Sequence, residues 1–159
     1  MARTFPTDHG DRCDSDFERA VIDDLILRGI DYEYESPNGR VEYVEPLKRG
    51  AHCIDCGSKK VGKSRYRTLD LYLPSTDIIV EIKGKFPAPM RALMKAMIAD
   101  NRDKDIRFFF MADTWLTTAK KSKLSDWARQ AGIECAFGDP RRNEGTIAYG
   151  VGGIPEEWV

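Results

Sequence analysis

Two apolar runs on either side of a short turn constrain the fold of this chain most. They are residues 69–73 and 78–84, and residues 74–77 separate them. Leu, Tyr, Ile and Val suit strands, and Pro with Asp marks a turn, so the stretch predicts a β-hairpin. A four-residue loop would place Leu73 opposite Ile78, and this register fixes every other pair.

The predicted register brings three charged residues to one face of the hairpin. Asp70 lies directly across from Glu81, and Lys83 follows two residues on along the same face. Facing carboxylates repel, and a divalent cation between them would remove the repulsion. Because Mg²⁺ (or Mn²⁺) takes oxygen ligands, Asp70 and Glu81 are candidate metal ligands, and Lys83 would orient water or stabilise a phosphate. The alternative is a solvated strand edge with ordinary charges.

The composition is that of one folded domain. The 159 residues are 42% hydrophobic, which is enough for a core. No run approaches the roughly 18 apolar residues of a membrane helix. The N-terminus has no signal-peptide core, so we expect a soluble cytoplasmic protein without a membrane partner. The net charge is −1, so contacts with nucleic acid would need a local basic patch.

Residues 40–67 form such a basic segment, with eight Lys and Arg residues against three acidic ones. A patch of this kind can hold DNA phosphates, and a solvated basic loop has the same composition. A later helix, around residues 90–98, adds two basic residues on its polar face. The candidate DNA-binding residues are Lys59, Lys60, Lys63, Arg65, Arg67, Arg91 and Lys95.

Residues 46–66 also contain Cys53 and Cys56 as a C-x-x-C pair. One pair is half of a zinc site, because structural zinc needs four ligands. Reduced thiols without a metal are the other interpretation. Further zinc ligands could be the same pair of a second subunit or residues elsewhere in the chain, namely His9, Cys13, His52 and Cys135.

The N-terminal part predicts an arm, a helix and a strand. Residues 1–14 are polar and we expect a mobile arm, followed by one domain over residues 15–159. Ser15-x-x-Glu18 is a capping box that opens a helix ending near Gly29, with Glu18 bonded to the Ser15 backbone N–H. Residues 30–35 alternate as a strand, and a turn at 37–39 predicts residues 41–44 as its hairpin partner.

The second half predicts alternating helices and strands. Met90, Leu93, Met94, Met97 and Ile98 have helical spacing, and residues 106–111 are an apolar run typical of a strand buried on both faces. A second helix ends at Gly132, and residues 133–137 form a last strand. This order implies parallel crossovers in an α/β sheet.

Seven short segments carry a family resemblance in their order and spacing. Asp70, Glu81 and Lys83 match the D…(D/E)-x-K signature of the restriction-endonuclease-like nucleases. The wider context resembles the endonuclease I, or Holliday-junction resolvase, family of T-odd bacteriophages. The segments are residues 15–18, 32–35, 68–74, 80–84, 105–107, 131–133 and 154–158.

The resemblance implies an α/β restriction-endonuclease-like fold, with a mixed central sheet flanked by helices, in an intertwined, segment-swapped homodimer. The implied activity is Mg²⁺-dependent hydrolysis of phosphodiester bonds in branched DNA. Glu18 and Glu33 would join the catalytic set, in place of a helix cap and a solvent-facing carboxylate, and residues 46–66 would be a bridge or insertion. Two alternatives stay open: a duplex-specific endonuclease, and a non-catalytic DNA-binding module stapled by zinc at Cys53 and Cys56.

Overall fold

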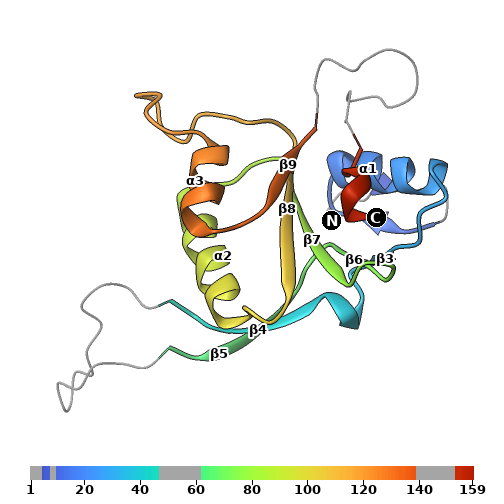
Figure 1. Cartoon of the computed structure of the whole chain (residues 1–159), viewed down its shortest axis with the longest axis horizontal. Coiled ribbons are helices and arrows are strands. Elements are labelled where there is room, and N and C mark those ends of the chain that lie inside the picture. The colour runs from blue at the N-terminus through green and yellow to red at the C-terminus, as the bar shows by residue number, and fades with distance from the viewer. Residues whose placement is uncertain (1–4, 8–9, 47–61, 139–152) are drawn as a thin grey trace.

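A mixed five-stranded sheet lies at the centre of the molecule, in the order β3-β6-β7-β8-β9 (Figure 1). The computed structural model describes residues 5–7, 10–46, 62–138 and 153–159. β6 is antiparallel to β3 and β7, whereas β7, β8 and β9 run parallel. The β6–β7 hairpin and the parallel crossovers agree with the sequence prediction, and the β3–β6 pairing does not. The strands are β3 (Glu33–Tyr34), β6 (Leu71–Leu73), β7 (Ile78–Lys83), β8 (Asp105–Phe110) and β9 (Cys135–Phe137).

Helices cover both faces of the sheet. α1 (Asp16–Leu27) lies on one face, and α2 (Ala88–Asp100) and α3 (Leu124–Ala131) lie on the other (Figure 1). The two crossovers β7-α2-β8 and β8-α3-β9 place their helices on the same side, because parallel crossovers share one handedness. The fold is therefore α/β, and no helix among the described residues is long and apolar enough to cross a membrane.

A hydrophobic core lies on each face of the sheet, and strand β8 contributes side chains to both. Phe109 points into the core under α1, where its ring stacks on Phe17 at 5.9 Å between centroids. Phe108 and Phe110 point into the core under α2 and α3. All three strand residues are fully buried, which confirms the prediction of a strand covered on both faces.

Helix α1 begins and ends at the predicted residues. Ser15 is the N-cap, and its side chain accepts a hydrogen bond from the Glu18 backbone N–H at 3.1 Å. Gly29 follows the last turn with φ of 66°, a left-handed conformation that glycine adopts at little cost. This cap places Glu18 in the first turn, at the edge of the sheet.

The predicted hairpin between residues 30–35 and 41–44 is wrong. β3 pairs with β6, and β4 (Arg40–Val44) pairs with β5 (Ser64–Thr68) in a separate two-stranded ribbon. Residues Pro37–Gly39 form a short 3-10 helix capped by Ser36, so the chain leaves β3 in a new direction. Gly39 then approaches Leu69 closely: the Leu69 N–H donates to the Gly39 carbonyl at 3.0 Å, and a Cβ on Gly39 would lie 3.2 Å from the Leu69 carbonyl oxygen.

The ribbon is fastened to the end of α2 by side chains. Asp100 accepts from the Val44 N–H at 2.8 Å, and Asn101 donates to the Glu42 carbonyl at 2.6 Å. The segment between the two ribbon strands, residues 47–61, lies outside the described residues. The predictions for zinc at Cys53, Cys56 and His52, and for DNA contacts of Lys59 and Lys60, fall on that segment.

The described part of the expected N-terminal arm is packed against the domain. β1 (Phe5–Pro6) pairs with β2 (Arg12–Cys13), and Cys13 is fully buried under α1. Asp11 accepts a hydrogen bond from the Tyr32 hydroxyl at 2.6 Å. Burial of the Cys13 side chain accounts for this packing. Residues 1–4 and 8–9 of the predicted arm lie outside the described residues.

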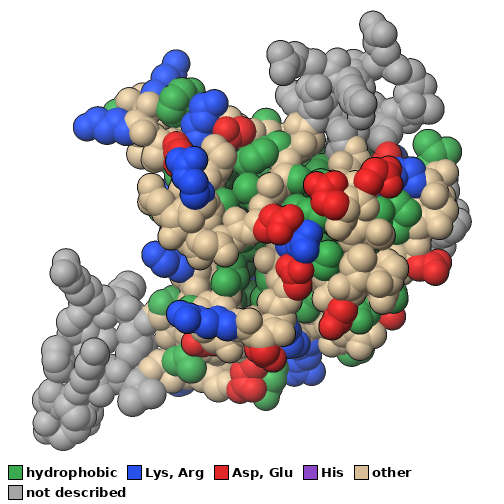
Figure 2. All heavy atoms as spheres, in the orientation of Figure 1, with side chains coloured by type: hydrophobic (Ala, Val, Ile, Leu, Met, Phe, Trp, Pro, Cys, Tyr) green, Lys and Arg blue, Asp and Glu red, His purple; other side chains and the backbone are tan. Residues whose placement is uncertain are grey.

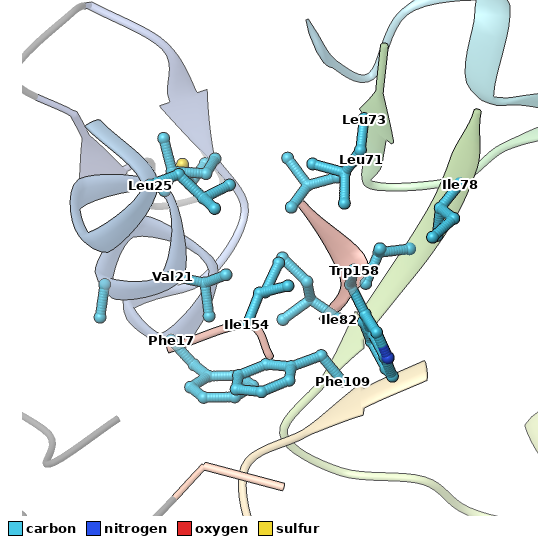
Figure 3. Close-up of a cluster of buried hydrophobic side chains, with 14 residues drawn as sticks. Phe17, Val21, Leu25, Leu71, Leu73, Ile78, Ile82, Phe109, Ile154 and Trp158 are labelled. Atoms are coloured by element: carbon cyan, nitrogen blue, oxygen red, sulfur yellow. The ribbon is translucent and has the colours of Figure 1, made fainter. Parts of the chain in front are cut away.

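A C-terminal segment completes the core under α1 (Figure 3). Ile154 and Trp158, from the segment that ends in a 3-10 helix (Glu156–Trp158), are almost fully buried there. The Trp158 indole N–H donates to Glu134 at 2.9 Å, and Thr76 donates to the Trp158 carbonyl at 2.8 Å. The segment therefore bridges α1 and the sheet.

Replacing Trp158 by Ala is expected to lower the free energy of unfolding by about 3–5 kcal/mol, because it leaves a large cavity between α1 and the sheet. Urea denaturation followed by circular dichroism measures the change. Leu27→Ala is the matched control: Leu27 is 70% exposed, so its loss should cost less than about 0.5 kcal/mol. Equal stability of the Trp158 variant and wild type would mean that the segment does not close this core.

Candidate functional site

Asp70, Glu81 and Lys83 meet where β6 and β7 begin to separate. Leu73 faces Ile78 in the hairpin, so the predicted register is correct. The Lys83 Nζ atom lies 2.8 Å from Glu81 Oε1 and 3.3 Å from Asp70 Oδ2. The two facing carboxylates therefore have a positive charge in contact with both of them.

A second cation reaches Glu81 from the ribbon. The Arg67 Nη2 atom on β5 donates to Glu81 Oε1 at 3.1 Å. Arg67 faces Val41 across the ribbon, and Val41 is buried, so the register turns Arg67 inward. The Arg67 guanidinium is thus paired with a fully buried carboxylate, and its contact with DNA phosphates stays a prediction.

The local environment sets the charge of Asp70 and Lys83. Burial, followed by the nearby Glu81, raises the pKa of Asp70 from its ordinary 3.8 to about 6. The carboxylate also accepts from the Ile82 N–H at 2.6 Å. Burial lowers the pKa of Lys83, but Glu81 and Asp70 outweigh it and the net pKa is raised. Lys83 therefore acts as a fixed cation and is unsuited to accept a proton.

Glu18 joins this site from the first turn of α1. Its carboxylate accepts from the Ser15 hydroxyl at 2.9 Å, from the Asp14 N–H at 3.1 Å and from the Tyr34 hydroxyl at 3.1 Å. These contacts replace the expected bond to the Ser15 backbone N–H. Burial, and then the charge of Asp70, raise the pKa of Glu18.

Glu18 and Lys83 line one hollow of about 510 Å³. Both residues belong to the same chain, so one chain brings the α1 carboxylate to the β6–β7 charges. Such an open, partly apolar hollow beside buried charges is the usual setting of a ligand site.

The structure places Glu35, and not Glu33, beside this cluster. Glu33 accepts from the Asn38 side chain at 2.8 Å, and its pKa is lowered by hydrogen bonds from Ser36 and Asn38. Glu35 has its pKa raised by burial and then by the charges of Asp14, Asp70 and Glu18.

A backbone feature explains why Glu35 was missed. Its φ of 47° is left-handed, which costs a residue other than glycine about 1–2 kcal/mol. Simple alternation along residues 30–35 fails at this point, because the unusual φ redirects the side chain. The Glu35 N–H donates to the Asp70 carbonyl at 2.9 Å, which holds the strained residue next to Asp70.

The charges at the site do not balance. Four carboxylates, on Glu18, Glu35, Asp70 and Glu81, lie near two cations, Lys83 and Arg67. Glu81 Oε2 is buried and has no hydrogen-bond partner among the described residues.

The donor set suits a hard divalent cation, because it offers carboxylate oxygens and spare negative charge. The described residues show no preformed group of three metal ligands, and the Lys83 ammonium contacts both Asp70 and Glu81. Asp70 and Glu81 are the residues that could hold such an ion.

The other predicted DNA-binding residues are spread over the surface on the α2 side. Figure 2 shows several Lys and Arg side chains at the α2–α3 side of the molecule. Lys63 and Lys95 are exposed, and Arg65 pairs with Glu45 at 3.2 Å. Arg91 is half-buried and donates to a backbone carbonyl at 2.7 Å.

Asp70→Asn is expected to stabilise the protein at neutral pH. The raised pKa means that the folded state binds a proton more tightly than the unfolded state, so stability falls as pH rises from about 4 to about 6. Asn does not titrate, so the gain should be about 1–3 kcal/mol at pH 7.5 and vanish near pH 4. Urea denaturation at both pH values measures it, and a gain that is the same at both would contradict the raised pKa.

Comparison with known proteins adds no identity to this geometry. The chain matches no model of a known protein family, and no curated protein gives a significant match.

Proposed function

We propose that the chain is a Mg²⁺-dependent endodeoxyribonuclease with a restriction-endonuclease-like fold, which hydrolyses phosphodiester bonds in branched DNA. The observation that carries the proposal is the contact of one half-buried lysine, Lys83, with two carboxylates on neighbouring strands. Glu18 lines the same hollow as Lys83. The choice of branched DNA rests on the resemblance to the phage endonuclease I family.

Asp70 and Glu81 would hold the Mg²⁺ (or Mn²⁺) ion through their carboxylate oxygens. When bound, such an ion polarises a phosphate and lowers the pKa of a bound water. Glu81 suits this role because its Oε2 atom has no protein partner among the described residues.

The protein's own groups would do the rest. Lys83 carries a positive charge and would stabilise the negative charge that grows on the phosphate during attack. Glu18, which lines the hollow, would accept a hydrogen bond from the attacking water. Arg67 holds the Glu81 carboxylate in place from the ribbon.

We propose further that each site is complete within one chain. The resemblance implies instead a homodimer in which each site takes Glu18 from one chain and Asp70, Glu81 and Lys83 from the other, and that arrangement stays a prediction. Helix α1 packs on the sheet of its own chain, and the β4–β5 pairing returns the chain to the sheet just before Asp70. Exchange of α1 between two chains is therefore not needed to bring Glu18 to Asp70 and Lys83.

Purified protein is expected to cut a four-way DNA junction in Mg²⁺. Glu81→Gln and Lys83→Ala should each lower the cleavage rate at least about 100-fold, because each removes several kcal/mol of charge stabilisation. Both variants should still bind the junction in EDTA. Glu157→Gln is the control, since Glu157 is an exposed carboxylate far along the chain from the site.

Three outcomes would contradict parts of the proposal. Near-normal cleavage by the Glu81 variant would show that Glu81 is not part of an active site. Cleavage of linear duplex at the same rate as the junction would favour a duplex-specific enzyme. Binding without any cleavage by wild type in Mg²⁺ or Mn²⁺ would favour a non-catalytic DNA-binding module.

Glu35→Gln is expected to slow cleavage about 10-fold or more, because Glu35 adds negative charge beside Asp70 and Glu18. Glu33→Gln is the matched control, two residues away on the chain, and should cleave like wild type. Single-turnover cleavage of the junction at saturating enzyme measures both. If Glu33→Gln is the slower variant, Glu33 is the catalytic acidic residue, as the family resemblance implies. The position of Glu35 beside Asp70 then has no catalytic role.

A further inference from the structure

An exposed tryptophan lies close to the candidate site and has no part in the chemistry described above. Trp115 is 47% exposed, whereas Trp158 is almost fully buried. Trp115 belongs to residues 112–123, which connect β8 to α3 and are called the Trp115 loop here. An indole at the surface offers a large flat face that is well suited to stacking.

The backbone of the Trp115 loop is held in place at its base. The Leu116 N–H donates to the Ser122 carbonyl at 2.9 Å, and the Leu124 N–H donates to the Thr114 carbonyl at 3.1 Å. These two bonds close the loop on both sides of Trp115. The ring is therefore presented by an ordered hairpin-like turn.

Neighbouring hollows connect the candidate site to this ring. The hollow lined by Glu18 and Lys83 extends to Gly84 and Lys85. A second hollow, also of about 510 Å³, shares Gly84 and Lys85 and is lined by Trp115. A strand of nucleic acid that leaves the site along this surface would reach the indole.

The second hollow has the charge that suits phosphates. Lys85 and Arg91 line it, and none of its described lining residues is acidic. Lys120 and Lys121 are exposed at the tip of the Trp115 loop, without ion-pair partners among the described residues.

One further lysine is partly neutralised. The Lys123 Nζ atom lies 5.2 Å from the centre of the Trp115 ring and 3.6 Å from an Asp113 oxygen. Even so, the loop and the hollow together carry a net positive charge.

We propose that Trp115 stacks on an unpaired base of single-stranded DNA, while Lys85, Arg91 and the loop lysines contact the flanking phosphates. This inference rests on the proposed function and names the part of the substrate that lies beside the cut. Bases in an intact duplex are already stacked on their neighbours, so only a frayed or branched substrate offers a free base face to the indole. The surface thus favours branched or frayed DNA that carries an unpaired strand over fully paired DNA.

The test measures binding without cleavage. Fluorescence anisotropy with a labelled 15-nucleotide oligo-dT, in EDTA, compares full-length wild type, Trp115→Ala, Trp115→Phe and Leu27→Ala. Trp115→Ala should weaken binding about 5- to 100-fold, the range of one lost base–aromatic stack. Trp115→Phe should stay within about 3-fold of wild type, because it keeps a stacking face. Leu27→Ala, at another exposed apolar side chain, should bind like wild type.

A charge variant tests the phosphate contacts. The double variant Lys120→Gln, Lys121→Gln should reduce the slope of log affinity against log salt by up to about 1.4, as expected for two lost contacts to single-stranded phosphates. An unchanged slope would show that these two lysines do not contact the DNA phosphates.

The proposal is overturned if wild type does not bind oligo-dT, if Trp115→Ala binds like wild type, or if the variant loses as much affinity for linear duplex. Each variant is first shown to be folded by its thermal unfolding. Junction cleavage by wild type is measured separately. Trp115-dependent binding without any cleavage would defeat the proposed function alone, and cleavage without Trp115-dependent binding would defeat this inference alone.

Discussion

The buried carboxylate of Glu81 needs compensating positive charges, and these come from several elements of the structure. Glu81 is fully buried on a central strand, where an unpaired charge would cost several kcal/mol. Lys83, two residues on, supplies one compensating charge, and Arg67 supplies another from outside the sheet. The ribbon that carries Arg67 is fastened to the end of α2 by Asp100 and Asn101. A single charge thus links the hairpin, the ribbon and the helix on the far face.

This arrangement leaves the negative charge of the site only partly compensated. The cations satisfy Glu81 only in part, since one oxygen has no partner among the described residues and Asp70 keeps a raised pKa. The protein therefore holds negative charge at a density that an incoming cation would relieve. Proteins commonly keep such unfavourable charge at sites that bind ions or react.

Helices and strands that depend on local patterns of residues could be predicted from the sequence. Loop length fixed the register that places Asp70 opposite Glu81, and apolar spacing located α1, α2 and β8. Three features depended on tertiary contacts and were missed. The β4–β5 pairing joins segments separated by residues 45–63, and the inward direction of the Arg67 side chain follows from that pairing. Glu35, rather than Glu33, lies beside Asp70 because Glu35 itself adopts a positive φ. Alternation identifies two faces of a strand, but it does not say which face is covered or where alternation stops.

The last segment of the chain has a consequence for how the protein is made. Ile154 and Trp158 fill the space between α1 and the sheet, while α1 itself comes from the first thirty residues. During synthesis the ribosome releases α1 long before residues 154–158, so the apolar face of the helix waits without its final cover. Closure of this core joins distant parts of the chain and is expected to be a late folding step. A nascent chain would thus carry all of its site residues, from Glu18 to Lys83, before the helix that holds Glu18 is locked in place.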